Sequence, residues 1–352
     1  MTQKADEMMD MDTVLIRRNQ AARNTGVQDL SLCEVWNRGD FLHTCFSSVG
    51  CRFREAGYCT MCDYGGGRAV TAKEAVSQLK KALEEAAGPV REILLGTCGS
   101  ILDEREMALP VLDAILETVR GNGIPTVIFE THYTTVTPQI LSRIQKALPD
   151  QEVVLELGFE SADPWVLKHS LCKYMNLDDL AGTVSLIQSF DMAAVLNVFL
   201  GAPFLTTEGQ IRDAINSIAW AVTNGANRVM VFPANIKPNT LLWQMYQEGS
   251  YCRISHWMLI ELLNRLDDRL LEKVELAWYG DRQAVGRAMA VIPPKSCPVC
   301  QQKLMDFYDA FLRDFDPQHR RQLLAELCEE ADCSCRASFL RELGASRGDC
   351  ER

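Results

Sequence analysis

The chain has 352 residues, of which 47% are hydrophobic and 24% charged, an ordinary balance for a soluble globular protein with a large core. Its formal net charge of −11 disfavours a protein that grips a phosphate backbone unaided, because such binding rests on clustered lysine and arginine. No apolar run is long enough to cross a bilayer, and the acidic opening stretch MTQKADEMMDMD lacks the features of a secretory signal. We therefore expect a cytoplasmic protein with no membrane partner.

Residues 1–37 are expected to form a lead segment ahead of the folded core. Within it, the stretch LIRRNQAARN is the best candidate for a local basic patch. Such a run is otherwise read as a solvated helix face. A putative first strand follows in DFLHTCFSSVGC, and the first helix is TAKEAVSQLKKALEEAAG, whose Thr71 and Glu74 suit a capping box.

Five short apolar runs follow, each too short for a typical helix and rich in valine, isoleucine, leucine or phenylalanine, which is typical of buried strands. They are REILLGT, PTVIFET, EVVLELGFES, AAVLNVFLGAP and NRVMVFPAN. Amphipathic stretches of helical length separate them. Alternating strands and helices predict right-handed crossovers and a parallel sheet.

With six strands, the expected fold is α/β, a partial (β/α)6 barrel of the TIM type over residues 38–250, with an open doubly wound sheet as the alternative. In both folds the chemistry lies where the strands end. Glu130, Glu160 and Asn197 each interrupt an otherwise apolar run near such an end. Three polar side chains in matching positions favour a functional site over surface residues or satisfied buried polar groups.

Cys51, Cys59 and Cys62 lie in one loop between the first strand and the first helix. Disulfides would leave one cysteine over, and a reducing compartment disfavours them. A tetrahedral zinc site needs four ligands, for which Cys45 or His43 is a candidate. Three cysteines instead suit a [4Fe–4S] cluster with one iron left open to a cofactor, and the glycines at 65–67 would let a small ligand approach the backbone.

The pattern changes after residue 250, where we expect a smaller, α-rich domain over residues 251–352 with a short strand at KVELAWYG. Two cysteine pairs lie in it, CxxC at Cys297 and Cys300 and CxC at Cys333 and Cys335. Together they would build a four-thiolate zinc site. A second iron–sulfur cluster and the absence of any metal remain the alternatives.

The Cx7CxxC spacing of the first cysteine loop, set in a β/α repeat, resembles the radical S-adenosylmethionine (SAM) superfamily. The common motif there is Cx3CxxC, and the longer spacing is similar to a subgroup near the radical-SAM subunit of archaeosine synthase and, more distantly, the elongator catalytic subunit. The likeness covers roughly residues 40–250. It extends through LGTCGSILD, VIFETHYTTVTPQIL, LELGFESADPWVL, VFLGAPFLTTEGQIRDAI and FPANIKPNTLLWQMYQEGSY.

By this resemblance, Cys51, Cys59 and Cys62 would ligate three irons of a [4Fe–4S] cluster, and SAM would bind the fourth. The usual acidic residue of the loop GTCGS is absent from this chain. The resemblance also implies a set of residues around SAM, which are Met61, Tyr64, Thr97, Gly99, Ser100, Glu160, Ser161, Asn197, Pro203 and Asn235.

The implied reaction is reductive cleavage of SAM to methionine and a 5′-deoxyadenosyl radical, which takes a hydrogen atom from a substrate. A reductant such as ferredoxin or flavodoxin would supply the electron. Candidate substrate-facing residues are Glu130, His132, Asn197, Lys237 and Arg68.

The acidic charge favours a small-molecule metabolite as substrate. The alternative is a carbon–nitrogen lyase acting on a tRNA base with a partner subunit that supplies the RNA contacts. Transfer of the aminocarboxypropyl group of SAM is a third reading. A hypothesis from a different functional class is a zinc-binding interaction module without catalysis. In that case the first cysteine loop would hold zinc.

Overall fold

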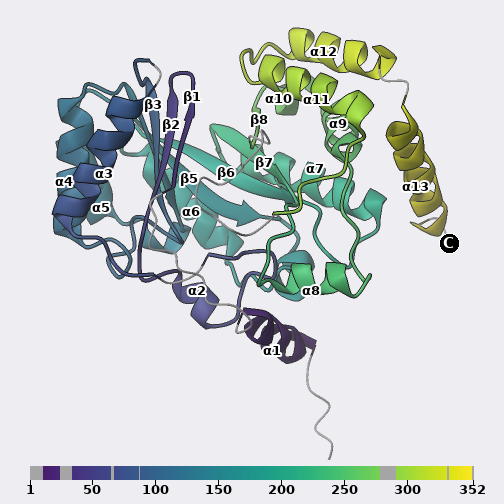
Figure 1. The fold of residues 1–352 in the computed structure, drawn as a ribbon, viewed down its shortest axis with the longest axis horizontal. Helices are drawn as coiled ribbons and strands as arrows, with labels where there is room; N and C mark the ends of the chain where they lie inside the picture. The colour runs from purple at the N-terminus through teal and green to yellow at the C-terminus, as the bar shows by residue number, and fades with distance from the viewer. Residues whose placement is uncertain are drawn as a thin grey trace, which may run out of the picture.

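A single eight-stranded sheet forms the centre of the computed structural model, which describes residues 11–23, 34–64, 67–86, 88–277, 291–330 and 333–350 (Figure 1). The strands follow each other in chain order across the sheet, and β1 pairs with β2 antiparallel whereas β2 to β8 are parallel. Their bounds are β1 Glu34–Arg38, β2 Phe41–Phe46, β3 Glu92–Thr97, β4 Thr126–Thr131, β5 Glu152–Glu160, β6 Ala193–Leu200, β7 Arg228–Pro233 and β8 Val274–Leu276. The predicted partial barrel is therefore confirmed.

Crossover helices cover the outer face of the curled sheet. They are α3 Ala72–Glu85, α4 Leu109–Gly121, α5 Pro138–Ala147, α6 Leu177–Gln188 and α7 Thr207–Thr223. In Figure 1, α3, α4 and α5 lie on the left, and the helices that follow the barrel lie on the right. The remaining helices are α1 Met11–Arg23, α2 Arg52–Glu55, α8 Leu241–Gln247, α9 His256–Arg265, α10 Asp268–Leu271, α11 Pro298–Phe311, α12 Pro317–Glu330 and α13 Ser334–Cys350, with short turns η1 Tyr133–Thr135 and η2 Val166–Ser170.

Local sequence signals explain where several of these elements begin. Thr71 and Glu74 form the predicted capping box at the start of α3, each side chain bonding the other residue's backbone. Asn176 caps α6 by accepting from two backbone N–H groups, and Pro138 opens α5 without needing a hydrogen bond. In β4 and β7, one face of the strand is buried beneath the helices, whereas alternate residues face the barrel interior and are half-buried.

The sheet extends beyond residue 250, where the barrel was expected to end. The short strand predicted in the C-terminal part is β8, and it pairs with β7 as a seventh parallel strand. Arg320 on α12 is fully buried and donates to the carbonyls of Leu271, the last residue of α10, and Val274, the first residue of this strand. The C-terminal helices are thus anchored on the edge of the barrel. The domain boundary at residue 250 remains a prediction.

The basic stretch near the N-terminus lies in α1. Arg18 forms an ion pair with Glu248, at 2.8 Å from Nη2 to Oε2, and Asn19 is fully buried, donating to the carbonyls of Gly57 and Tyr58. This helix therefore contacts the cysteine loop and α8 rather than presenting only a solvated face. Residues 1–10 and 24–33 of the lead segment lie outside the described residues. Within the described part of the chain, no helix has both the length and the apolar character that a membrane crossing requires.

Candidate functional site

The concave side of the half-barrel encloses a cavity of about 1410 Å³. Because successive side chains of a strand point to opposite faces, alternate residues of β4, β5 and β6 reach this space. Of the residues proposed from the sequence, seven line the cavity, which are Met61, Tyr64, Glu130, Glu160, Asn197, Asn235 and Lys237, together with Cys62. The sequence therefore placed most of the candidate polar groups around one interior volume.

The loop that carries the three cysteines is tied to the segment following β5. The backbone N–H of Cys59 donates to the carbonyl of Cys172 at 3.1 Å, and Thr60 donates to the carbonyl of Leu171 at 2.9 Å. Cys59 has a φ of +63°, a left-handed conformation that residues other than glycine adopt rarely. Such a conformation persists where the surroundings hold it, as these hydrogen bonds do. Gly65 and Gly66, expected to admit a ligand, lie outside the described residues.

The first cysteine loop is separate from the compact group of ligating atoms in the C-terminal part of the described chain, whose members all lie within 4.8 Å of one another. A tetrahedral zinc site needs sulfurs about 3.8 Å apart. Three thiolates in one loop can instead each bind a different iron of a polynuclear cluster.

A buried ammonium group lies beside this loop. Lys173 Nζ is 2.8 Å from Glu160 Oε1 and 2.9 Å from the carbonyl oxygen of Gly158. Burial raises the pKa of the Cys59 thiol to about 12, against the opposing effect of the Lys173 charge. Gly158 makes room for this arrangement, since a Cβ there would lie 3.0 Å from Nζ. Lys173 was missed by sequence reasoning, because a lysine outside a regular element looks like a solvated one.

A buried carboxylate also lies beneath the GTCGS loop. Glu106 is 2% exposed and accepts hydrogen bonds from Thr97 Oγ1 at 2.9 Å, Ser48 Oγ at 3.0 Å and the backbone N–H of Ser100 at 3.0 Å. Gly99 is required here, because a Cβ would lie 2.2 Å from a Glu106 oxygen. Burial raises the pKa of Glu106 despite these donors. The acidic group that the loop's own sequence lacks is thus present nine residues after Thr97.

Five of the proposed cofactor contacts do not line the cavity, which are Thr97, Gly99, Ser100, Ser161 and Pro203. Ser161 is fully buried and donates to Asp213 Oδ1 of α7 at 2.7 Å. Pro203 offers its carbonyl to Ser170 Oγ at 2.7 Å. Ser100 Oγ lies 2.5 Å from Thr131 Oγ1 and accepts from the backbone N–H of His132. In this structure these groups hold loops in place.

His132, the candidate that directly follows β4, does not line the cavity either. Its ring lies 4.3 Å from that of Phe53 in the cysteine loop, and its Nδ1 is 2.8 Å from Thr134 Oγ1. Burial, with the Lys173 and Arg52 charges, lowers its pKa to about 3. His132 is therefore a neutral imidazole that packs against the cysteine loop.

Lys237 does reach the cavity, and its charge is balanced there. Its Nζ is 3.0 Å from Asp63 Oδ1 and 4.7 Å from the centre of the Tyr64 ring. Asp63 and Tyr64 follow Cys62 directly. Lys237 therefore connects the segment after β7 to the cysteine loop across the mouth of the barrel.

The four cysteines of the C-terminal part come together at the beginnings of α11 and α13. Cys300 Sγ is 3.1 Å from Cys335 Sγ and 3.5 Å from Cys297 Sγ, and Cys333 Sγ is 3.5 Å from Cys335 Sγ. All four sulfurs lie within 4.8 Å of one another, which is the spacing of a tetrahedral thiolate site. Cys328 instead accepts from Asn264 Nδ2 at 3.7 Å and is not in the group. A site that could hold the predicted zinc is therefore present.

Replacing Cys300 by serine is expected to remove one zinc per chain and to lower the melting temperature by roughly 5–10 °C, because metal affinity at such a site is also folding free energy. Elemental analysis of the purified protein and a thermal melt with and without a chelator would measure both. Cys328→Ser is the matched control and should keep the metal. Equal zinc content in both variants would contradict a metal at this site.

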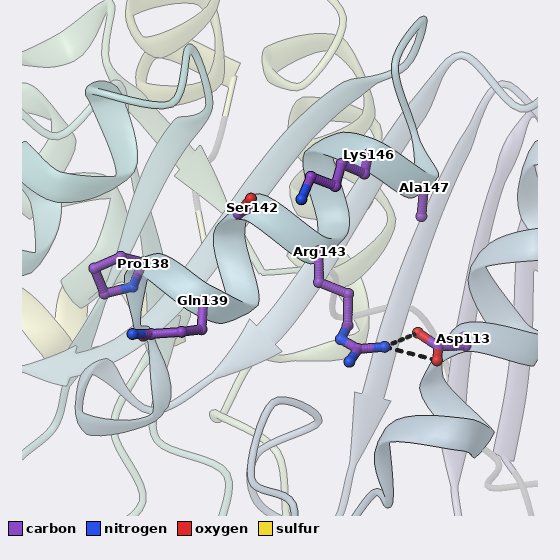
Figure 2. A pocket seen from close by; sticks show the side chains of 7 residues that line it. All are labelled: Asp113, Pro138, Gln139, Ser142, Arg143, Lys146 and Ala147. Atoms are coloured by element: carbon purple, nitrogen blue, oxygen red, sulfur yellow. Dashed lines mark hydrogen bonds and ion pairs between the residues drawn. The ribbon is translucent and has the colours of Figure 1, made fainter.

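A second concavity, of about 730 Å³, lies on the outer surface between α4 and α5. Figure 2 shows the Arg143 guanidinium pointing to the carboxylate of Asp113, with 2.7 Å between the two groups, and Lys146 and Gln139 beside them on α5. These are exposed side chains on helix surfaces, and the cysteines do not line the concavity. It offers no group arranged for catalysis.

Comparisons with known proteins agree with this site. No protein-family model matches the chain. The chain is 25% identical over 303 residues to archaeosine synthase subunit beta of Methanosarcina acetivorans, covering 85% of this chain and 83% of that protein.

Solved structures of similar fold include a queuine lyase from Clostridium spiroforme bound to SAM and queuine. Its TM-score to this chain is 0.45 at 15% identity, and the match covers 73% of this chain and 98% of that chain. An N-terminally truncated Elp3 of Methanocaldococcus infernus has a TM-score of 0.47 at 14% identity, over 69% of this chain and 58% of that chain. The cysteine spacing and the parallel half-barrel agree with the sequence relationship over most of the chain. The chain therefore resembles archaeosine synthase subunit beta over most of its length, with its three-cysteine loop set on a parallel half-barrel.

Proposed function

We propose that this enzyme cleaves SAM reductively and uses the resulting radical to abstract hydrogen from a small-molecule substrate in the barrel cavity. The observation that carries the proposal is the placement of the three-cysteine loop at the mouth of the large cavity, with Cys62 itself in the cavity wall. When bound, the cluster would supply one electron to the sulfonium of SAM. This reduction would yield methionine and a 5′-deoxyadenosyl radical.

The residues around the loop have distinct tasks in this proposal. Cys51, Cys59 and Cys62 hold the cluster. Glu106, buried beneath the GTCGS loop, supplies the negative charge that favours an ammonium group, such as the amino group of SAM. Lys173 and Glu160 form a buried ion pair at 2.8 Å that fixes the opposite side of the pocket.

Among the other residues proposed to contact SAM, Met61 and Tyr64 follow the loop into the cavity, and Asn235 lies beyond β7. Ser161, Thr97 and Ser100 support the loops that carry the neighbouring backbone. An enclosed wall lined by Phe199 and Phe232 excludes water, which protects a reactive radical from side reactions.

A small molecule is favoured as substrate by the charge of the cavity. Its acidic lining residues, which include Glu130, Glu156, Glu160 and Glu275, outnumber the basic ones, which are Arg228, Lys237, Lys273 and Arg313. Lys237 is paired with Asp63. A polyanion such as RNA would be repelled from these walls. A reductant such as ferredoxin or flavodoxin would deliver the electron from outside.

Modification of a tRNA base together with a partner subunit is the second candidate function. The observation in its favour is the relationship to a protein named as a subunit of archaeosine synthase, which covers 83% of that protein. Within the described residues of α1, Arg18 is paired with Glu248, so RNA contacts would have to come from the partner.

The proposal is tested by anaerobic reconstitution with iron and sulfide, reduction with dithionite, addition of SAM, and mass spectrometry of the products. We expect about four irons at the first cysteine loop and 5′-deoxyadenosine as the product. Methylthioadenosine in its place would indicate transfer of the aminocarboxypropyl group. Zinc without iron and intact SAM would overturn the proposal.

A further inference from the structure

Two carboxylates and one amide oxygen meet halfway along the interior of the barrel. Glu130 on β4 and Glu156 on β5 are partners in the parallel register, so their side chains leave the sheet side by side. Asn197 on the next strand donates from Nδ2 to Glu156 Oε1 at 2.9 Å. All three line the cavity of about 1410 Å³. We call Glu130, Glu156 and Asn197 the acceptor triad.

Two members of the triad, Glu156 and Asn197, are buried. Glu156 is 5% exposed and Asn197 is 6% exposed. Asn197 Oδ1 is buried and accepts no hydrogen bond from the described residues, which is unusual because buried polar atoms are nearly always paired. Asn197 lines the cavity, so a small rotation of its amide would present this acceptor to a donor that enters it.

The electrostatics of the triad also call for a positive charge. Burial, followed by the neighbouring charge of Glu130, raises the pKa of Glu156 to about 8. The further groups that raise it, Glu275 and Glu160, are acidic as well. Two adjacent carboxyl groups in a space with little water do not readily ionise together, and a cation between them would favour the ionised form of both.

The surrounding wall fits the rest of such a ligand. Phe199 and Phe232 are register partners on β6 and β7, and Phe199 lies two residues beyond Asn197 along its strand, toward the mouth of the barrel. Tyr64, two residues after Cys62, lines the same cavity. Aromatic side chains therefore line the cavity that the triad shares with Cys62.

A glycine on β3 leaves space for the side chain of Glu130. Gly96 faces Glu130, and a Cβ at this glycine would lie 3.1 Å from Glu130 Oε2. A side chain here would press on the carboxylate. The absence of one leaves Glu130 directed into the cavity beside Glu156.

We propose that the substrate is an amine, held by its protonated nitrogen on Glu130, Glu156 and Asn197, with its carbon skeleton along Phe199 and Phe232 toward the cysteine loop. A protonated primary or secondary amine supplies both the charge and the several N–H donors that three acceptors require. An alcohol lacks the charge, and a carboxylate would be repelled. The inference rests on the proposed function for the identity of the pocket, and it specifies the substrate class that this pocket takes.

The test uses three ligands of equal length, n-hexylamine, n-hexanol and hexanoate, titrated into the full reconstituted chain with S-adenosylhomocysteine present and followed by calorimetry. The amine should bind about tenfold or more tightly than the alcohol, and hexanoate should not bind measurably. Glu156→Gln, which keeps the shape but cannot carry the charge, should weaken the amine about tenfold and leave the alcohol unchanged. Glu130→Gln should do the same, so the test does not depend on one variant folding.

Glu152→Gln is the matched control. Glu152 lies on the same strand and lines the same cavity at the other end of the barrel, so its loss alters the overall charge equally. Equal affinities for amine and alcohol, or an equal weakening by Glu152→Gln and Glu156→Gln, would overturn the inference.

Formation of 5′-deoxyadenosine by the unmodified protein in the same preparation separates the two proposals. If SAM is cleaved but the amine shows no preference for the triad, the inference alone is wrong. If the amine binds at the triad but SAM stays intact, the proposed function is wrong and the amine site stands.

Discussion

Replacement of Cys59 by alanine is expected to reduce 5′-deoxyadenosine formation by about 100-fold or more and to remove the iron of the first cysteine loop. The measurement is an iron count together with product analysis on the anaerobically reconstituted variant. The loss should be greater than that for residues that only orient the loop, because Cys59 would be a direct ligand.

The backbone conformation at Cys59 also positions a second cysteine of the loop. The backbone N–H of Cys59 bonds the Cys172 carbonyl and its own carbonyl accepts from Cys62 at 3.1 Å, so the left-handed turn at φ +63° sets the position of the next thiol. The buried thiol has a pKa of about 12 and would be protonated without metal. Iron binding must therefore displace the proton, and a site lacking one thiolate has less binding free energy to do so.

Cys252→Ala is the matched control for this prediction. Cys252 is an exposed free cysteine after α8, away from both metal sites. Its replacement should leave the iron content and the product yield within error of the unmodified protein. An unchanged iron content in Cys59→Ala would contradict the assignment of Cys59 as a ligand.

Most of the barrel could be predicted from the sequence, because its strands are short, β-branched and bounded by helices with their own caps. The runs that became β3 to β7 are apolar enough to be recognised without a partner. β8 was harder to place, since a three-residue strand, Val274–Leu276, carries little periodicity and its pairing with β7 depends on the fold as a whole. Buried Arg320, which anchors the following helices there, looks like any charged residue in the sequence.

The candidate cysteine ligands are recognisable in the sequence because their spacing is local, whereas the buried groups around them are not. Glu106 lies within DEREM, a charged stretch that resembles a solvated turn, and it becomes buried only when Ser48 and Thr97 fold over it. Glu152 and Glu156 of β5 both face the cavity. The sequence of this strand alone does not show which of the two lies beside a carboxylate of the neighbouring strand. Such pairings arise from register between strands.

Replacement of Lys173 by methionine is expected to destabilise the folded chain by about 3–5 kcal/mol, because removing one partner of a buried ion pair leaves the other charge uncompensated. The side chains of Lys173 and Glu160 are 10% and 15% exposed, and their atoms are 2.8 Å apart. Urea unfolding of the protein without its cluster measures the loss directly.

The double variant Lys173→Met/Glu160→Gln separates the lost ion pair from lost packing. If the cost arises from an unpaired carboxylate, neutralising Glu160 should recover most of the stability that the single variant loses. The exposed pair of Arg143 and Asp113, with side chains 38% and 48% exposed, is the matched control, and Arg143→Met should cost less than about 1 kcal/mol. A double variant as unstable as Lys173→Met alone would show that Lys173 stabilises the fold through contacts other than Glu160, and that its charge is available to the cysteine loop.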